Sequence, residues 1–348
     1  MRKRTSALIL ISVIIITLLC YSQVVLSPAR TPSPGALSVA VNARRGMHVV
    51  EGHKDPSSVL DRRRSNMLAK CRGLDSSYPA TWLTNVTRGL SVCVPPKAGH
   101  TSWERVKREL SQVGPIDGST KILSVRHPLV RLTSAYRDKY LDGKPLHRTP
   151  EPKKTWIWWR RYWFPALLSR GDIPPPRWMT LEVRSTQTLP DPCQRVAKEN
   201  MYVYLKAREL EKPWHQSRFQ NTTFSFQDFL NHVLWTARLR QLDYHWAPQT
   251  CLCNPCKVRY DYVLHLENIG HELDHVLRDL GIAQEIPVPR VHVTKDDDRM
   301  SDAGYYKDVP QKIMRQIYSL FRYDFDVLNY SRSLGDLDAM IVCERLLQ

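Results

Sequence analysis

The chain has 348 residues, of which 42% are hydrophobic. This composition predicts a globular protein with a packed core and excludes a wholly disordered chain. Its formal net charge of +17 favours polyanionic partners, namely nucleic acid, acidic lipid head groups, or sulfated and uronic-acid glycans. Charge alone does not choose among these classes.

An apolar segment near the N-terminus predicts a membrane anchor. Residues 7–26 carry no charge and follow Arg2, Lys3 and Arg4, which is the pattern of a signal anchor with its basic end in the cytosol. The alternative is a cleaved secretory signal. Both interpretations place the rest of the chain in the secretory lumen. Three N-x-[ST] sequons agree with this location: Asn85, Asn221 and Asn329.

The remaining boundaries follow from composition. Residues 1–6 form the predicted cytosolic tail, the Pro- and Ser-rich residues 27–67 a flexible stem, and residues 68–348 the folded lumenal domain. Seven cysteines lie beyond the anchor, and in an oxidising lumen we expect most of them to pair. The odd number leaves one thiol free or intermolecular, and the spacing does not fix which cysteines pair.

The first informative motif is PPKAGHTSWERV, Pro95 to Val106. The apolar run Leu90 to Val94 predicts a buried strand that ends at two prolines, and a helix is predicted from Thr101. Small residues, unpaired helix N–H groups and the charge of Lys97 suit a phosphate or sulfate ester. The order differs from GxxxxGK[ST] of nucleoside triphosphatases, because Lys97 precedes Gly99. A basic turn that binds nothing is the plainer alternative.

The second motif is VRHPLVRLTSAYRDKY, Val125 to Tyr140. An apolar strand from Lys121 to Val125 is predicted to turn at His127 and continue as a helix through Tyr140. Ligands bind at the carboxyl ends of parallel strands, so Lys97 and Arg126 should face one cavity. Two anion sites on neighbouring strands predict a nucleotide with a phosphate at each end.

With these two segments the chain resembles Golgi carbohydrate sulfotransferases of the chondroitin/dermatan 4-O-sulfotransferase family. The family motif PKxxxxNWKR resembles Lys97 to Arg105, with His100 and Ser102 as departures, and R-x-P-x-x-R-L-x-SAYR-[ND]-K-[FY] resembles Arg126 to Tyr140. The similarity extends from about Leu90 to Ser331. Further matching segments are FSFQDFL (Phe224 to Leu230), DYHWAPQTCLCNPC (Asp243 to Cys256), YDYVLHLEN (Tyr260 to Asn268) and YSLFRYDFDVLNYS (Tyr318 to Ser331).

The resemblance implies an α/β fold of the P-loop-like sulfotransferase type, with a central parallel sheet flanked by helices. It implies a single-pass type II protein of the Golgi membrane with a lumenal catalytic domain. The implied donor is 3′-phosphoadenosine 5′-phosphosulfate, without a metal. The implied acceptor is a glycosaminoglycan or related glycan rather than nucleic acid, with position 4 of N-acetylgalactosamine in chondroitin or dermatan as the favoured hydroxyl.

The residues expected to hold this donor come from both motifs. They are Lys97, Ala98, Gly99, His100, Thr101, Ser102, Trp103, Arg126 and Ser134. By analogy with phosphoryl transfer, we expect catalysis to consist of positioning, cationic stabilisation of the leaving group and a base for the attacking hydroxyl. Lys97 is the expected partner of the leaving phosphate oxygens, and Arg126 with Ser134 is expected at the 3′-phosphate.

His245 is the leading candidate for the base, because an imidazole titrates near neutral pH and the family has a histidine there. Asp243 or Glu267 is expected to orient it. Glu104, one turn into the helix after the first loop, is the alternative base. A structural histidine beside Trp246 is the competing interpretation for His245.

Two other segments have competing interpretations. TWIWWRRYWF, Thr155 to Phe164, is either an acceptor-binding surface or an amphipathic helix whose tryptophans pack on the core, and we favour packing. CxCxxC at Cys251 to Cys256 is typical of disulfides or, less so, of a zinc site. The family pattern implies disulfide partners at Cys253 and Cys256, with Cys251 as an addition.

Three functions remain open from the sequence. The first is a sulfotransferase acting on a glycan. The second is an ATP-dependent phosphotransferase, which the missing Lys-Ser/Thr order and missing magnesium carboxylates disfavour. The third is a non-catalytic, membrane-anchored binder of acidic glycans on the same fold.

Overall fold

In the computed structural model, four strands form one mixed sheet in the order β1–β2–β3–β4. The strands are β1 (Leu83–Thr87), β2 (Leu90–Cys93), β3 (Thr120–Val125) and β4 (Tyr262–His265). β2, β3 and β4 are parallel, as predicted, whereas the edge strand β1 is antiparallel to β2. A purely parallel sheet was therefore wrong at this edge. The reason is the short turn at Arg88 and Gly89, where Gly89 has φ +89° and packs against the carbonyl of Ile116.

The structure describes residues 56–72, 78–112, 114–116, 118–185, 214–282 and 300–333, with positions 189, 191, 193 and 212. The predicted cytosolic tail and anchor lie outside these residues, as do most of the predicted stem and Cys343. Within the described ranges, no helix is long and apolar enough to cross a bilayer.

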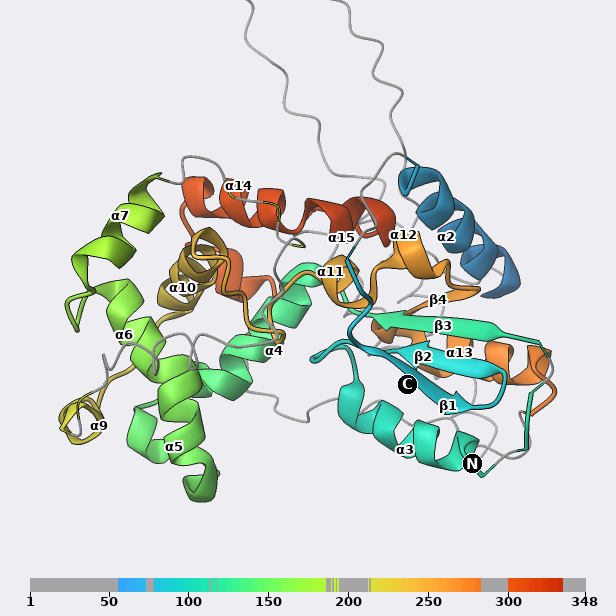
Figure 1. The fold of residues 1–348 in the computed structure, drawn as a ribbon, viewed down its shortest axis with the longest axis horizontal. Coiled ribbons are helices and arrows are strands. Elements are labelled where there is room, and N and C mark those ends of the chain that lie inside the picture. The colour runs from blue at the N-terminus through green and yellow to red at the C-terminus, as the bar shows by residue number, and fades with distance from the viewer. Residues whose placement is uncertain are drawn as a thin grey trace, which may run out of the picture. The chain divides into compact units, whose positions relative to one another are not determined.

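The parallel strands end at one edge of the sheet, where three connections meet. β2 leads through the loop after Cys93 into α3 (His100–Leu110), β3 leads into α4 (Pro128–Lys139), and β4 leads into a short 3-10 turn and α13 (Ile269–Asp279). Figure 1 shows this edge turned toward the middle of the drawing, where α4 and α11 (Gln249–Cys253) lie. The predicted strand-to-helix connections at Lys97 and Arg126 are confirmed.

Helices cover both sides of the sheet. α3 lies along β1, and α2 (Pro56–Lys70) packs on β4 and α13 (Figure 1). The predicted stem reached residue 67, yet α2 belongs to the folded domain and buries Val59, Leu60 and Met67. The polar composition of this segment suggested a flexible stem. Its buried Arg63, however, forms an ion pair at 2.8 Å with Glu272, a partner far away in the sequence.

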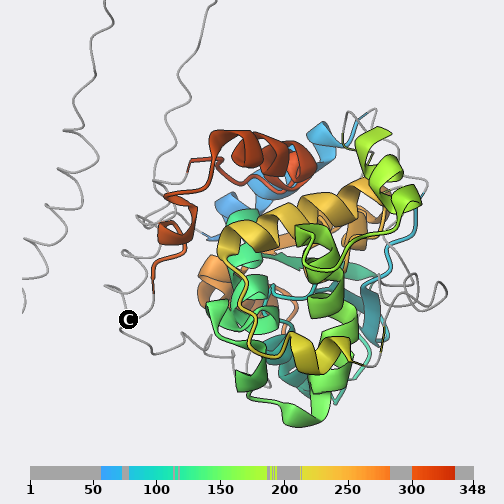
Figure 2. The same ribbon diagram turned by 90° about the vertical axis from the view of Figure 1, so that its left-hand side faces the viewer.

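A second, all-helical region follows α4. Its elements are α5 (Thr155–Trp158), the π-helix η4 (Trp159–Trp163), α6 (Phe164–Arg170), α7 (Arg177–Ser185), α9 (His215–Arg218), α10 (Phe226–Arg238) and α14 (Gln311–Leu320). The short helices α12 (Pro255–Val258) and α15 (Arg322–Val327) instead contact α2 beside the sheet. α10 packs against α6, α7 and α14, and Figure 2 shows α14 (red) above α10 (yellow). Trp158, Trp159 and Trp163 are buried here, which confirms the packing interpretation for most of TWIWWRRYWF.

Three disulfides converge on the segment after His245. They join Cys71 to Cys256, Cys93 to Cys253, and Cys193 to Cys251. The expectation that most cysteines beyond residue 26 pair is confirmed, and Cys251 is a third disulfide partner in this segment. All three cysteines of CxCxxC are oxidised, so no thiolate is left for zinc and that alternative was wrong. Among the described residues, no cluster of His, Cys, Asp and Glu has the arrangement of a metal site.

Candidate active site

The loop after β2 presents backbone N–H groups at the edge of the sheet. Lys97 and Gly99 adopt left-handed conformations, with φ 68° and 82°. The Ala98 amide donates to Pro95 O at 3.1 Å and the Trp103 amide donates to Gly99 O at 3.0 Å. Between these two, no hydrogen bond within the described residues uses the amides of residues 99–102. Such a row of unpaired donors at the start of α3 is suited to an anion.

Gly99 fixes this loop against the connection after β4. A Cβ atom at this position would lie 2.6 Å from Leu266 Cδ1, and the backbone is left-handed as well. Only glycine satisfies both conditions without a shift of neighbouring atoms. The loops after β2 and β4 are therefore in close contact, which sets the position of the free amides.

Lys97 and Arg126 lie side by side, as the sequence predicts. Arg126 Nη1 donates to the Lys97 carbonyl at 3.4 Å. The Lys97 ammonium forms an ion pair with Asp138, which lies four residues after Ser134 and so shares its face of α4. Burial lowers the pKa of Lys97, and the Asp138 carboxylate partly offsets this effect. Lys97 and Arg126 thus lie together at the loop, and the half-buried Ser134 shares the face of α4 that carries the Lys97 partner Asp138.

Gln249 clamps the backbone of Arg126. The Arg126 amide donates to Gln249 Oε1 at 2.9 Å, and Gln249 Nε2 donates to Arg126 O at 2.7 Å. The buried carboxylate of Asp324 in turn accepts from the Gln249 amide at 2.8 Å. The end of β3 is therefore held to α11. No local pattern in the sequence indicates this clamp, because Arg126 and Gln249 are 123 residues apart.

Arg131, which the sequence analysis left unassigned, ties the first loop to the segment that carries His245. Its buried guanidinium donates to Pro96 O at 2.8 Å, to Tyr244 O at 2.8 Å and to Ala247 O at 2.6 Å. Three carbonyl partners satisfy a buried cation that would otherwise be costly. The positions of Lys97 and His245 are therefore coupled through one side chain.

Asp243 orients His245, which is one of the two predicted possibilities. Asp243 Oδ1 lies 2.7 Å from His245 Nδ1 and accepts from the His245 amide at 2.9 Å. Burial alone would raise the pKa of Asp243, but the contacts with His245 and Arg161 outweigh it and hold that pKa well below its ordinary value. An ionised Asp243 can only accept, so Nδ1 carries the proton and the lone pair lies on Nε2.

Burial lowers the pKa of His245, although Asp243 opposes the effect. The imidazole is therefore neutral at neutral pH, which is the form a general base needs. The cations Lys139 and Lys97 lie close enough to lower the pKa of His245 further. Together with the bonds of Arg131 to both segments, this places the loop after β2 near the His245 imidazole.

The π-helix η4 brings two consecutive side chains to this pair. Arg161 Nε donates to Asp243 Oδ2 at 2.9 Å, and the Tyr162 hydroxyl lies 3.3 Å from His245 Nδ1. Widened π-turns occur often at functional sites. The sequence pointed to this segment only as a surface or a packing helix, and the contact of Arg161 with Asp243 was missed.

The other predicted residues fall into two groups. The Trp103 indole is buried and donates to Ser124 Oγ at 2.9 Å, so its side chain belongs to the core, as does Ala98. Thr101 and Ser102 lie in the first turn of α3, where Thr101 is exposed and Ser102 is half-buried. His100 stands beside the loop, 3.8 Å from Glu104, with its ring against Trp82. These positions leave Thr101, Ser102 and His100 accessible from the anion loop.

Glu104 and Glu267 do not reach His245. Glu104 pairs with Lys107 at 3.1 Å and, together with Asn85, lines a groove between α3 and β1. The hydrogen bond from Lys107 is the main reason that the pKa of Glu104 is lowered, which weakens it as a base. Glu267 instead accepts from the His127 amide at 2.7 Å and from the Tyr330 hydroxyl at 3.1 Å. The expectation that Glu267 orients His245 was therefore wrong.

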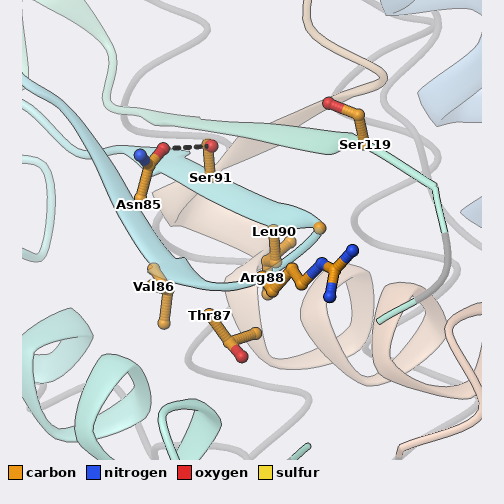
Figure 3. A pocket seen from close by; sticks show the side chains of 8 residues that line it. Asn85, Val86, Thr87, Arg88, Leu90, Ser91 and Ser119 are labelled. Carbon is orange, nitrogen blue, oxygen red and sulfur yellow. Dashed lines mark hydrogen bonds between the residues drawn. The ribbon is translucent and has the colours of Figure 1, made fainter. Parts of the chain in front are cut away.

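A separate pocket lies at the opposite edge of the sheet (Figure 3). It is formed by the β1–β2 hairpin and Ser119, and the Ser91 hydroxyl donates to Asn85 Oδ1 at 2.8 Å across it. This edge holds the amino ends of β2 and β3, whereas ligands of parallel sheets bind at the carboxyl ends. We therefore assign the site to the Lys97 edge.

The family model for sulfotransferases matches residues 94–331, from the first loop to the end of the described chain. The match covers more than half of the chain, so the chain belongs to the sulfotransferase family.

Individual relatives are carbohydrate sulfotransferases. The chain is 23% identical to carbohydrate sulfotransferase 12 of Xenopus laevis over 352 residues, which is 87% of this chain and 77% of the relative. Identity to carbohydrate sulfotransferase 12 of Mus musculus is 22%, over 61% of this chain and 40% of the relative. Identity to carbohydrate sulfotransferase 9 of Homo sapiens is 26%, over 30% of this chain and 25% of the relative. The chain thus matches less than two thirds of the mouse and human proteins. No solved structure matches significantly.

Proposed function

We propose that this protein transfers a sulfuryl group from 3′-phosphoadenosine 5′-phosphosulfate to a sugar hydroxyl of a glycan. The observation that carries the proposal is that two groups of residues lie close together. The cations Lys97 and Arg126 lie beside unpaired amides, and the neutral imidazole of His245 is close enough to Lys97 for its charge to lower the imidazole pKa. The names of the relatives support a glycan as acceptor. For its hydroxyl we propose position 4 of N-acetylgalactosamine in chondroitin or dermatan.

The donor's 5′-phosphosulfate would lie on the amides of Gly99 to Ser102 and on Lys97. Its 3′-phosphate would take the forked donor of Arg126 and the hydroxyl of Ser134. The Lys97 ammonium is paired with Asp138 in this structure. Lys97 must therefore share or leave that carboxylate when it contacts the donor, and Lys139, at 3.0 Å, remains to neutralise Asp138.

Catalysis by this arrangement needs no covalent intermediate on the protein. His245 Nε2 accepts the proton of the attacking hydroxyl while the oxygen–sulfur bond to the acceptor forms. The sulfur–oxygen bond to the 5′-phosphate breaks on the opposite side, and Lys97 with the loop amides stabilises the negative charge that develops there. Asp243 keeps the proton on Nδ1, so that the lone pair stays directed at the acceptor.

The test is transfer of labelled sulfate from the donor to a panel of desulfated glycans, followed by disaccharide analysis. We expect incorporation into chondroitin or dermatan at position 4 of N-acetylgalactosamine. Incorporation into another glycan would replace the acceptor and keep the reaction. Tight binding of adenosine 3′,5′-bisphosphate without transfer to any glycan would instead favour a non-catalytic glycan binder, and ATP hydrolysis would favour a phosphotransferase.

The location of the protein is also a proposal. We propose that residues 7–26 anchor it as a single-pass type II protein in the Golgi membrane, with the catalytic domain in the lumen. The disulfides agree with an oxidising compartment. In sealed microsomes, the catalytic domain should resist added protease until detergent is present. Digestion without detergent would contradict the orientation.

A further inference from the structure

Arg161 faces the acid–base pair from the helical region, and its role goes beyond packing. Resting on the proposed function, we infer that Arg161 is a positioning residue that holds Asp243 in place and keeps His245 an effective base near neutral pH.

Each oxygen of Asp243 has its own donors. Oδ1 takes the ring Nδ1 and the amide of His245, at 2.7 and 2.9 Å, and Oδ2 takes Arg161 Nε at 2.9 Å. The carboxylate is 3% exposed, so few water molecules can substitute for a lost donor. Rotation of this carboxylate would break bonds on both sides at once. Arg161 therefore fixes the plane in which Asp243 meets the imidazole.

Arg161 is itself held rigidly. Its guanidinium carbon lies 4.3 Å from the centre of the Tyr244 ring, and its side chain is 17% exposed. The next residue, Tyr162, places its hydroxyl 3.3 Å from His245 Nδ1. The π-helix η4 thus contacts the pair through two neighbouring residues, and Tyr244 contacts both Arg161 and the His245 ring. A planar, stacked guanidinium loses little freedom in such a contact.

The charge of Arg161 acts on the imidazole through Asp243. The ionisable groups around His245 are Asp243, Tyr162, Tyr244, Lys139 and Lys97. Arg161 lies one contact further away, against Asp243 and Tyr244. Asp243 is the anion among them, and it favours the protonated, inactive imidazole. Arg161 balances part of that negative charge, so its loss should raise the pKa of His245. A base with a raised pKa is protonated over more of the neutral pH range, so the rate of sulfate transfer should fall on the acid side of neutrality.

The experiment compares Arg161→Gln and Arg161→Lys with the wild-type full-length protein. We measure sulfate transfer as a function of pH and the titration of the His245 imidazole by NMR, assigned through His245→Gln. For Arg161→Gln we expect the acid limb of kcat to move to higher pH, with turnover at pH 6 lowered on the order of tenfold relative to its own plateau. Arg161→Lys keeps the charge and should restore most of the profile.

Arg170→Gln is the matched control. Arg170 ends α6, in the same helical run, and pairs with Asp172 at 2.7 Å and Asp228 at 3.2 Å, away from His245. This variant loses an Arg–Asp contact of the same kind and should leave the pH profile unchanged. An Arg161→Gln protein that melts like wild type and titrates His245 like wild type would overturn the inference.

The NMR titration separates this inference from the proposed function. If His245 shifts in Arg161→Gln while no glycan accepts sulfate, the coupling of Arg161 to His245 stands and the proposed reaction fails. If transfer occurs in wild type but the pH profile and the NMR titration stay fixed in Arg161→Gln, the reaction stands and the role of Arg161 fails.

Discussion

The donor end and the base end of the site are built in different ways. At the donor end, the groups proposed to meet the anion are backbone amides and two cations placed by consecutive strand ends, Lys97 after β2 and Arg126 after β3. At the base end, His245 depends on a buried side-chain network in which Asp243 and Arg161 lie 82 residues apart. Two short sequence motifs contain the residues of the donor end, whereas the contacts of the base end appear only in the folded chain.

The two ends should therefore lose activity in different ways when their residues are replaced. Backbone geometry survives most side-chain changes, so the donor end should lose affinity in proportion to the charge removed. A buried network is cooperative, so removal of one member should change protonation as well as position.

Replacement of His245 should separate turnover from binding. We expect His245→Ala to lower turnover by roughly 10²- to 10⁴-fold, which is the usual contribution of a general base. Affinity for adenosine 3′,5′-bisphosphate should stay near wild type, because His245 is not assigned to the phosphates. Turnover comes from the sulfate-transfer assay and affinity from calorimetry. The exposed His271→Ala serves as the control. Loss of both activity and affinity would make His245 structural.

Lys97→Ala should affect binding and turnover together. The variant loses a charge-assisted contact worth about 1.5–3 kcal/mol and a cation that stabilises the leaving phosphate, which together predict a roughly 10²- to 10³-fold loss in kcat/KM. Lys121→Ala, on the neighbouring strand but at the opposite edge, should be close to wild type. A Lys97→Ala enzyme with normal kcat/KM would remove Lys97 from the mechanism.

Gly99→Ala tests the backbone part of the donor end. The added methyl group would lie 2.6 Å from Leu266 Cδ1, so the loop or Leu266 must move, and donor affinity should fall about tenfold if roughly 1–3 kcal/mol of strain reaches the loop. Gly171→Ala has a similar φ of +91° but open space around the new methyl group. It should lose stability alone. Equal donor affinity in the two variants would show that the close approach to Leu266 is unimportant.

Glu104→Gln should have the smallest effect. Glu104 is half exposed and pairs with Lys107, so its loss should cost less than about 1 kcal/mol of stability and leave turnover close to wild type. Thermal melting and the transfer assay measure both. A loss of turnover as large as that of His245→Ala would make Glu104 the base and would contradict the assignment of His245.

Some elements of the fold could be predicted from the sequence, and some contacts could not. The strands ending near Cys93 and Val125, and the helices after them, follow from apolar runs broken by proline, and these predictions are confirmed. The antiparallel β1, the folded helix α2 and the contact of Arg161 with Asp243 were missed. In each case the deciding partner is distant: Ile116 packs on Gly89, Glu272 neutralises Arg63, and Arg161 meets Asp243 across the helical region. Local patterns do not encode such contacts.

The most direct test of the account is calorimetric titration with adenosine 3′,5′-bisphosphate and its two monophosphates, for wild type, Lys97→Ala and Arg126→Ala. We predict that the wild-type protein binds the bisphosphate most tightly. The Lys97→Ala variant should bind the bisphosphate no more tightly than it binds the 3′-monophosphate, because its contact with the 5′-phosphate is lost. The Arg126→Ala variant should bind the bisphosphate no more tightly than it binds the 5′-monophosphate. If both variants bind the bisphosphate as wild type does, the two cations do not hold opposite ends of one nucleotide, and the account is contradicted.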